Sequence, residues 1–368
     1  MAHATYPLTV DQPYPREQWW VAAYASEVGR SLLGRDILGE RVLLYRTAEG
    51  AAVALSGICP HRAFPLEMGR LVGDTVQCGY HGFTFGQDGT CLLVPSQPGV
   101  PQRSGLRRYP VVERGGVIWI WTGAPETADP ALLPDHDRIG LGAPGWVVDF
   151  QELATIEARY TLLIENLLDL SHVTFIHSQT IPAGEKVAGL PVNVAQERER
   201  LTVLRKAVGI PANPMIRAQF PDQEGAVDQE FDAEYIGPNL IRTGGTISDH
   251  ASGRALGTQN FLHMITPAAP GRLHYFVATT RNFGHDNPAL SAMNLAMGER
   301  IQPEDVAAIT AIEQVLRSGT TLPREISARV DNGALKVRRL LEAQIRRESV
   351  PVPTAPAPTA PILTDASA

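Results

Sequence analysis

The sequence is short of cysteine, of long apolar runs and of positive charge, and each shortage excludes a class of protein. Its 368 residues include three cysteines, an odd and sparse set that argues against a disulfide framework. The longest apolar runs, such as Val117–Trp121, are far too short to cross a bilayer. The formal net charge of −7 argues against nucleic-acid binding, because proteins that bind nucleic acid carry basic patches. We therefore expect an acidic globular enzyme with no nucleic-acid or membrane partner.

Residues 1–20 also lack the apolar segment of a secretory signal peptide, which predicts a cytoplasmic location. No flavin or nicotinamide fingerprint is evident, so redox chemistry would require a separate reductase. The hydrophobic content of 44% and the charged content of 19% are ordinary for a globular protein. A chain of 368 residues is long enough for about two domains.

Local patterns divide the chain into an all-β first part and a second part that mixes strands with helices. Arg41–Arg46 and Ala52–Leu55 are typical of two strands joined by a turn at Glu49-Gly50. Helices are predicted at 162–175, 303–316 and 332–347. The predicted organisation is an N-terminal extension at 1–16, an all-β domain at 17–125, a connector at 126–145, a mixed domain at 146–350 and a disordered Pro/Ala-rich tail at 351–368.

The strongest signal in the first domain is a pair of short segments that each combine one cysteine with one histidine. Cys59-Pro60-His61 is followed by sixteen residues and then by Cys78-Gly79-Tyr80-His81. Two cysteines and two histidines can bind Zn²⁺ or a Rieske [2Fe–2S] cluster. Zinc fingers usually separate the two residue types, whereas a Rieske cluster takes one of each from both arms, so the mixed arms favour the cluster. Cys91 lies outside both segments and is expected to be a buried thiol.

A second unusual segment lies in the first helix of the mixed domain. Asn166, Asp169 and His172 are spaced by three residues, which places them along one side of a helix. His177 lies five residues beyond His172, about 140° away on a helix with roughly 3.6 residues per turn. For both imidazoles to reach one metal, the helix must end or bend near Phe175.

A mononuclear Fe(II) that activates O₂ commonly has two histidine ligands and one carboxylate ligand. The carboxylate must come from elsewhere in the chain, and Asp305 is our candidate. It lies beside Glu304 at the predicted start of the helix that follows Pro303. The alternative is a carboxylate placed at a helix start because the helix dipole favours it there.

In this order, the motifs resemble those of the Rieske non-haem iron aromatic-ring oxygenases. The similarity covers about residues 15–347 and is greatest to the oxygenase components of vanillate and dicamba O-demethylases and of toluenesulfonate methyl-monooxygenase. The motifs that carry it are Cys59–Arg62, Cys78–Gly82, Val111–Glu113 with Ile118–Trp121, Asn166–His177, Arg281–Phe283 and Glu304-Asp305.

The resemblance implies an α+β protein, with an N-terminal all-β Rieske domain and a helix-grip (START-like) catalytic domain built on an antiparallel sheet. The implied [2Fe–2S] ligands are Cys59, His61, Cys78 and His81. The implied Fe²⁺ ligands are His172, His177 and Asp305, with Asn166 nearby but not firmly bound. Asp169 would join His81 of one subunit to His172 of the next, which requires a closed ring of subunits, usually a homotrimer.

The resemblance also implies a reaction and a set of partners. O₂ would be the co-substrate, and a separate reductase or ferredoxin would supply electrons from NAD(P)H. One oxygen atom would enter a methyl or methoxy group of a small, possibly anionic aromatic compound. The alternatives are cis-dihydroxylation of an aromatic ring and, in another class, a Rieske electron-transfer protein with a non-catalytic ligand-binding domain. The presence of Asn166–His177 together with Asp305 argues against the last.

Three residues are expected to contact the substrate or its anionic group. His263 precedes the turn at Thr266-Pro267 and matches a substrate-binding histidine of the demethylases. Asn239 matches a pocket asparagine if a small gap is allowed. Arg242 is a further residue that an anion could meet, although a structural role is the more common one for such a cation.

Overall fold

The computed structural model describes residues 14–181 and 189–349. Most of the predicted N-terminal extension and the predicted Pro/Ala-rich tail lie outside the described residues. Within the described ranges, no helix has both the length and the apolar character needed to cross a membrane.

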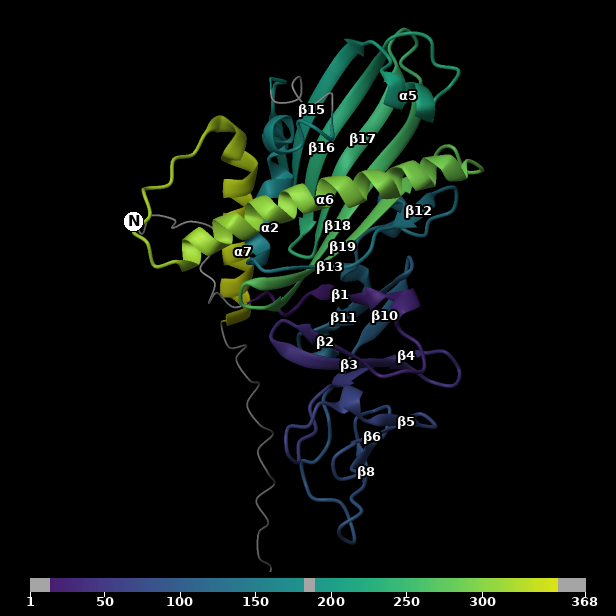
Figure 1. Cartoon of the computed structure of the whole chain (residues 1–368), viewed down its shortest axis with the longest axis vertical. Coiled ribbons are helices and arrows are strands. Elements are labelled where there is room, and N and C mark those ends of the chain that lie inside the picture. Colours follow the sequence, from purple (N-terminus) through teal and green to yellow (C-terminus); the bar gives the residue numbers. More distant parts are fainter. Residues whose placement is uncertain (1–13, 182–188, 350–368) are drawn as a thin grey trace, which may run out of the picture.

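Three small antiparallel sheets form the N-terminal part of the chain, as expected for an all-β domain (Figure 1). The predicted hairpin is present as β3 (Glu40–Arg46) and β4 (Ala52–Ser56), with Leu43 opposite Leu55. The first sheet has the order β1 (Trp19–Tyr24), β11 (Val117–Trp121), β10 (Val111–Arg114). The second has the order β2 (Leu33–Ile37), β3 (Glu40–Arg46), β4 (Ala52–Ser56), β9 (Arg108–Tyr109). The third has the order β5 (Arg70–Val72), β6 (Thr75–Gln77), β7 (Thr84–Phe85), β8 (Cys91–Leu93).

The predicted connector at 126–145 contains only short helical turns. They are η3 (Pro125–Thr127), η4 (Pro130–Leu132) and α1 (His136–Ile139). Asp135 accepts a hydrogen bond from the amide of Arg138 and so caps α1, while Gly140 ends it with a φ of 73°. Helices of this length position the chain but bury little surface of their own.

An eight-stranded antiparallel sheet dominates the C-terminal part, which confirms the predicted fold class (Figure 1). Its order is β12 (Val147–Phe150), β19 (Arg272–Arg281), β18 (Ala255–Ala269), β17 (Leu240–Asp249), β16 (Val227–Gly237), β15 (Arg200–Ile210), β14 (Asn193–Glu197), and β13 (Ala154–Ile156) also pairs with β19. One face carries a core of apolar residues that includes Leu201, Ala233, Ile241 and Ile265.

Helices cover that face of the sheet, and the longest, α6, runs across it (Figure 1). The helices are α2 (Tyr160–Leu168), η5 (Leu170–His172), α3 (Val173–Ile176), α5 (Pro214–Gln219), α6 (Pro288–Arg317), η6 (Arg329–Asp331) and α7 (Asn332–Ser349). Ile164 and Leu168 of α2, Ile309 of α6 and Val337 of α7 pack into the same core as the sheet residues.

Two helix boundaries differ from the sequence-based expectation. The helix expected to start after Pro303 begins fifteen residues earlier, at Pro288, where Asn287 accepts a hydrogen bond from the amide of Ala289. Pro303 lies inside α6, so Asp305 is an interior residue and not a helix-start carboxylate. The helix predicted at 162–175 is interrupted at Asp169, whose φ and ψ of −111° and 89° end α2. Its last turn, α3, ends at Ile176, which agrees with the end expected near Phe175.

The two parts of the chain pack together along β1, β2 and β18. Trp19 and Val21 of β1 share a buried cluster with Met264 of β18 and Phe276 of β19. The hydroxyl of Thr266 donates to the carbonyl of Val21 at 2.8 Å. Strands β5–β8, which carry the segment Cys78–His81 between β6 and β7, lie at the end of the N-terminal part away from the large sheet (Figure 1).

Candidate metal centres

The two Cys/His segments fold as a matched pair of loops. The amide of Cys59 donates to the carbonyl of Phe64 at 2.9 Å, and the amide of Cys78 donates to the carbonyl of Phe83 at 2.8 Å. In each loop the residue four positions after the cysteine donates back to the cysteine carbonyl and has a positive φ. The two arms therefore present a cysteine and a histidine with similar backbone geometry.

These loops bury the two cysteines and expose the two histidines. Cys59 and Cys78 are 1% and 3% exposed, while the rings of His61 and His81 lie on the surface with centroids 4.6 Å apart. Burial, the largest cause, raises the pKa of the Cys59 thiol to about 11. A thiolate at this position therefore needs a nearby positive charge, which a metal provides.

A single zinc ion would draw its four ligand atoms close together, because zinc–ligand bonds are about 2.0–2.3 Å long. Among the described residues, one group of three or more His, Cys, Asp and Glu side chains has its ligand atoms within 4.8 Å of one another. That group contains none of these four side chains. A two-iron cluster spreads its ligands over two metals, with the cysteines on one and the histidines on the other. The buried thiols and exposed imidazoles fit that arrangement.

The compact group consists of His172, His177 and Asp305. The Nε2 atoms of His172 and His177 lie 3.4 Å and 3.2 Å from Oδ1 of Asp305. His172 ends η5, His177 follows α3, and Asp305 comes from the middle of α6, so three elements meet here. Two imidazoles and one carboxylate on one side of a metal are the ligand set of non-haem Fe(II) oxygenases.

Each histidine of this group is oriented by a hydrogen bond from its other ring nitrogen. Nδ1 of His172 donates to the backbone carbonyl of Asp169 at 2.5 Å. Nδ1 of His177 donates to Oε2 of Glu304 at 2.7 Å, and the hydroxyl of Thr180 donates to the same oxygen at 2.7 Å. Both Nε2 atoms would thereby be available to hold a metal, as in sites where a second residue fixes the histidine tautomer.

Glu304 and Thr180 were not identified as site residues from the sequence. The proximity of Glu304 to Asp305 was visible there, but neighbouring residues on a helix point about 100° apart, so a joint role was not expected. The signal that could have found Glu304 is the need of a metal-bound histidine for an acceptor at its second nitrogen.

The charges of the site favour its metal-binding form. Burial acts most strongly on Asp305 and would raise its pKa, but the hydrogen bond and charge of His177, with His172 and Asn166, hold that pKa below its usual value. Burial likewise opposes protonation of His177, yet the carboxylates of Asp305 and Glu304 outweigh it and raise the pKa of His177. The two carboxylates therefore favour a positive charge between the imidazoles, as a bound cation would supply.

Asn166 and Asp169 border this group in different ways. Nδ2 of Asn166 donates to Oδ1 of Asp305 at 3.1 Å, while its own Oδ1 is buried and makes no hydrogen bond. That free oxygen fits a residue beside the metal. The carboxylate of Asp169 accepts hydrogen bonds of 2.9 Å from both the amide and the hydroxyl of Ser171.

The link between Asp169 and His172 differs from the one implied by the resemblance. It runs through the main-chain carbonyl of Asp169 and not through its carboxylate, because the carboxylate caps η5 through Ser171. The same carboxylate lies 3.6 Å from Nη2 of Arg205, which is fully buried and makes no hydrogen bond. Burial lowers the pKa of Arg205, and the charge of Asp169 opposes that shift.

The three residues expected to meet the substrate are placed differently from one another. His263 lies near Asp305, whose charge acts on it, although burial is the larger influence and lowers the pKa of His263 to about 4. Asn239 is 1% exposed and donates to the backbone carbonyl of Trp19 at 2.5 Å, so it belongs to the junction between the two parts of the chain. The expectation that Asn239 contacts substrate loses its support.

Arg242 has a structural role. Its guanidinium is buried on β17 and is hydrogen-bonded to Asp232, Glu234 and Asn260. Burial is the largest single influence on the pKa of Arg242 and lowers it. The hydrogen bonds and charges of Asp232 and Glu234 outweigh burial, so the pKa is raised. A guanidinium already shared among three acceptors is not available to an anionic substrate.

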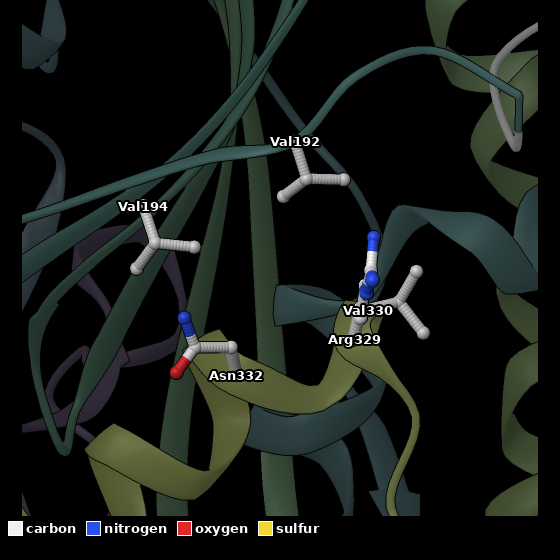
Figure 2. Close-up of a pocket in the computed structure, with 5 residues that line it drawn as sticks. All are labelled: Val192, Val194, Arg329, Val330 and Asn332. Atoms are coloured by element: carbon white, nitrogen blue, oxygen red, sulfur yellow. The ribbon is translucent and has the colours of Figure 1, made fainter.

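A separate cavity of about 340 Å³ lies at the β14 edge of the large sheet (Figure 2). Its walls are Val192 and Val194 from the strand edge and Arg329, Val330 and Asn332 from η6 and the start of α7. It includes none of the metal-site residues and has one charged side chain, that of Arg329. It offers no set of groups for acid–base or metal chemistry.

Comparison with known proteins agrees with both centres. Residues 18–110 match the Rieske [2Fe–2S] domain family, and residues 156–347 match the vanillate O-demethylase oxygenase C-terminal domain family. The iron–sulfur subunit of the toluene-4-sulfonate monooxygenase system of Comamonas testosteroni is 31% identical over 351 residues, covering 89% of this chain and 97% of that one. The vanillate O-demethylase oxygenase subunit of a Pseudomonas species is 30% identical over 349 residues, covering 91% and 96%.

Solved structures agree with the sequence relatives. Dicamba monooxygenase bound to 3,6-dichlorosalicylic acid superposes with a TM-score of 0.83 at 28% identity, over 92% of this chain and all of that one. The same enzyme with non-haem iron and dicamba gives a TM-score of 0.78.

The fold and the two centres thus define an oxygenase that joins a Rieske cluster to a mononuclear non-haem iron. The chain belongs to the vanillate O-demethylase family of Rieske oxygenase components. Its cofactors are a [2Fe–2S] cluster and a mononuclear iron, and a separate reductase or ferredoxin is its electron donor.

Proposed function

We propose that this chain inserts one oxygen atom into a methyl or methoxy group of a small aromatic compound, with release of an alcohol or formaldehyde. The observation that carries the proposal is the convergence of His172, His177 and Asp305, whose ligand atoms lie within 4.8 Å of one another. The Nδ1 atom of each histidine is already hydrogen-bonded to the protein, which leaves Nε2 for a metal. The relatives above are monooxygenases or demethylases of aromatic acids by name, which favours this reaction over cis-dihydroxylation.

In this proposal Cys59, His61, Cys78 and His81 hold the cluster, and His172, His177 and Asp305 hold the iron. When bound, the cluster supplies single electrons and the iron activates O₂. The protein residues keep that chemistry in place: the Asp169 carbonyl and Glu304 orient the two imidazoles, and Asn166 fixes the Asp305 carboxylate. His263, on which the charge of Asp305 acts, is proposed to belong to the substrate pocket beside the iron.

We also propose that the active form is a homotrimer in which each cluster serves the iron of the next subunit through Asp169. Strands β5–β8, with the segment Cys78–His81 between β6 and β7, lie away from the large sheet of their own chain (Figure 1). The side chains of Met68 and Tyr80 beside the cluster loops are 67% and 60% exposed, and Phe175 beside the iron group is 76% exposed. Apolar surfaces of this kind at both centres suit contact between copies.

The boundaries proposed for the two domains are 17–125 and 146–350, with the connector at 126–145 between them. The family matches at 18–110 and 156–347 lie inside these ranges and support them. The cytoplasmic location remains a prediction from the sequence.

A turnover screen tests the proposed reaction. The purified protein, supplied with NADH and a surrogate reductase, should consume O₂ in the presence of some methoxy-, methyl- or N-methyl-bearing aromatic acid and release formaldehyde or the alcohol in equal amount. Asp305→Ala should abolish product while the EPR signal of the reduced cluster persists. The exposed carboxylate Asp286 supplies the control, Asp286→Asn, which should keep full activity.

Two results would contradict the proposal. Formation of a cis-diol would show dioxygenation instead. A wild-type protein that carries the cluster but binds no iron at His172, His177 and Asp305 would be an electron-transfer protein and not an oxygenase.

A further inference from the structure

Arg205 occupies a position of the large sheet that favours an apolar side chain. Buried and more exposed residues alternate along β15, and the buried set faces the helices that cover the sheet. Its members are Leu201, Val203, Arg205 and Ala207. A guanidinium in this row is costly to bury, because it takes a charge and five N–H donors out of water. Stability alone therefore does not explain why an arginine is found here.

The charge partner of Arg205 is Asp169, but the two side chains do not form a hydrogen bond. Nη2 of Arg205 lies 3.6 Å from Oδ1 of Asp169. None of the three guanidinium nitrogens has a hydrogen-bond partner among the described residues. By contrast, the buried Arg159 donates from Nε to the carboxylate of Glu313 at 2.7 Å and so clamps two elements together. Arg205 acts on its carboxylate through charge and not through such a clamp.

Ser171 explains why the two charges stay apart. Its amide and its hydroxyl each donate to the Asp169 carboxylate at 2.9 Å, the amide to Oδ1 and the hydroxyl to Oδ2. These bonds hold the carboxylate at the start of η5. The side chain of Asp169 is 23% exposed and that of Arg205 is 0% exposed. The carboxylate therefore has a positive charge on its buried side and keeps an accessible side for a partner.

The accessible side of Asp169 is proposed above to meet the partner subunit's His81, a ligand of the cluster. We infer that Arg205 is a positioning residue for electron transfer: it offsets the charge of the Asp169 carboxylate and thereby raises the reduction potential of the cluster that the carboxylate contacts. Reduction adds one electron, supplied by the reductase, so a nearby anion opposes it and a nearby cation favours it. Asp169 thus remains a hydrogen-bond acceptor without hindering reduction as strongly as an unpaired carboxylate would.

This inference rests on the proposed function, because it places Asp169 of one subunit beside the cluster of another. It goes beyond that proposal by assigning a role to a buried cation that touches neither metal site.

Urea unfolding of the full-length, metal-loaded protein tests whether Arg205 and Asp169 are paired within one chain. Asp169→Asn removes the counter-charge of a buried cation and should lower the urea midpoint of the C-terminal part. In an Arg205→Met protein the same substitution should lower it by much less, because no buried charge is left unpaired. Arg205→Met alone should leave the midpoint unchanged or raise it, since methionine suits an apolar row.

Redox titration of the same proteins tests the effect on the cluster. The absorbance of the cluster would be followed against the applied potential, without substrate or O₂. Arg205→Met should make the reduction potential more negative, and Asp169→Asn should make it more positive. Arg205→Lys should remain near the wild type, because lysine keeps the charge.

Lys206→Met supplies the matched control. Lys206 is the next residue on β15, and its side chain is 47% exposed on the opposite face of the strand. The substitution removes the same charge, but solvent and salt screen it, so the potential should not change. A merely structural role of Arg205 would move the urea midpoint and leave the potential unchanged.

The inference is overturned if Arg205→Met shifts the potential no further than Lys206→Met does. It is also overturned if Asp169→Asn lowers the urea midpoint equally with and without Arg205.

Failure of the proposed function gives a different pattern. If Asp169→Asn shifts the potential and Arg205→Met does not, the inference fails and the contact between subunits stands. If neither substitution shifts the potential and Asp169→Asn keeps full turnover, the route between subunits is wrong and the inference falls with it. A wild type that shows both shifts but oxidises no aromatic compound would contradict the proposed reaction and support the role of Arg205.

Discussion

Nδ1 of His172 lies 2.5 Å from the backbone carbonyl oxygen of Asp169, so the residue proposed to connect two subunits holds the iron ligand through its main chain. The Asp169 carboxylate is occupied separately, by Ser171 and by the nearby charge of Arg205. The main-chain carbonyl of Asp169 thus orients the iron ligand, while its carboxylate is the group proposed to contact the next subunit. Substitution of the side chain should affect the contact between subunits and leave the orientation of His172 unchanged.

Asp169→Asn should retain both metals but lose most product formation. The main-chain carbonyl that holds His172 is unchanged, and asparagine caps a helix about as well as aspartate. The charge between the two centres is lost, and product formation should fall at least ~10-fold, the scale seen when groups that orient metal-bound histidines are removed. Metal content and cluster reduction by dithionite should match the wild type. Loss of iron on this substitution would show that the carboxylate itself supports the iron site.

Glu304→Ala should weaken iron binding, because His177 loses the acceptor that fixes its ring. Substitutions of such partners typically cost about 10- to 100-fold in metal affinity. The dissociation constant for Fe²⁺ under anaerobic conditions measures the effect, and the cluster should remain intact. Thr180→Val removes the hydroxyl that donates to the same carboxylate and should cause a smaller change in the same direction. Equal iron affinity in Glu304→Ala and wild type would contradict this role.

Asn239→Ala should destabilise the protein and leave substrate affinity unchanged. The substitution removes the short hydrogen bond to the buried carbonyl of Trp19 and leaves that oxygen with the longer one, 3.4 Å, from Nε2 of Gln18, a loss of about 0.5–1.5 kcal/mol. Urea denaturation with a probe on each domain measures the loss. A raised KM with unchanged stability would contradict this role and show that Asn239 contacts the substrate.

The free energy of unfolding should fall as the pH falls from 6.5 to 4, in part because of His274. Burial, with the charges of Arg35 and Arg272, lowers the pKa of His274 from 6.5 to about 4. Within this window the unfolded chain binds a proton that the folded protein excludes, so stability decreases with decreasing pH. The contribution is at most about 3.4 kcal/mol, because each pKa unit corresponds to about 1.36 kcal/mol.

His274→Gln supplies the comparison, since glutamine keeps a donor toward the carbonyl of Asp36 but does not titrate. Its stability should depend less on pH than that of the wild type between pH 6.5 and 4. Parallel curves for the two proteins would show that His274 is not the titrating group.

The sequence was sufficient to predict the ligand types of both centres, because each is carried by closely spaced residues of unusual chemistry. Asp305 could be chosen from the sequence, but its helix was misplaced. Pro303 was taken as a helix start, although Asn287-Pro288 carries an equally good capping signal. With α6 beginning at Pro288, the position of Asp305 depends on how a long helix packs over the sheet, and that is a tertiary property.

The substrate-facing residues were harder to predict, because strand register decides them. A shift of one residue moves a side chain to the opposite face of a sheet, so a match that needs a gap cannot place Asn239. Tyr275 and Thr243 have no sequence signature of their own. They flank His263 because β17, β18 and β19 bring them to either side of it.

Subunit mixing tests most directly the central claim that a cluster in one chain serves the iron of another. Cys78→Ala removes a cluster ligand and His172→Ala removes an iron ligand, and each variant alone should be inactive. After random exchange of equal amounts in a closed ring of three, each mixed trimer has one productive pair out of three, so the whole mixture should regain roughly a quarter of wild-type activity. If exchanged trimers form, retain the expected metals and remain inactive, electrons do not cross between subunits and the account is contradicted.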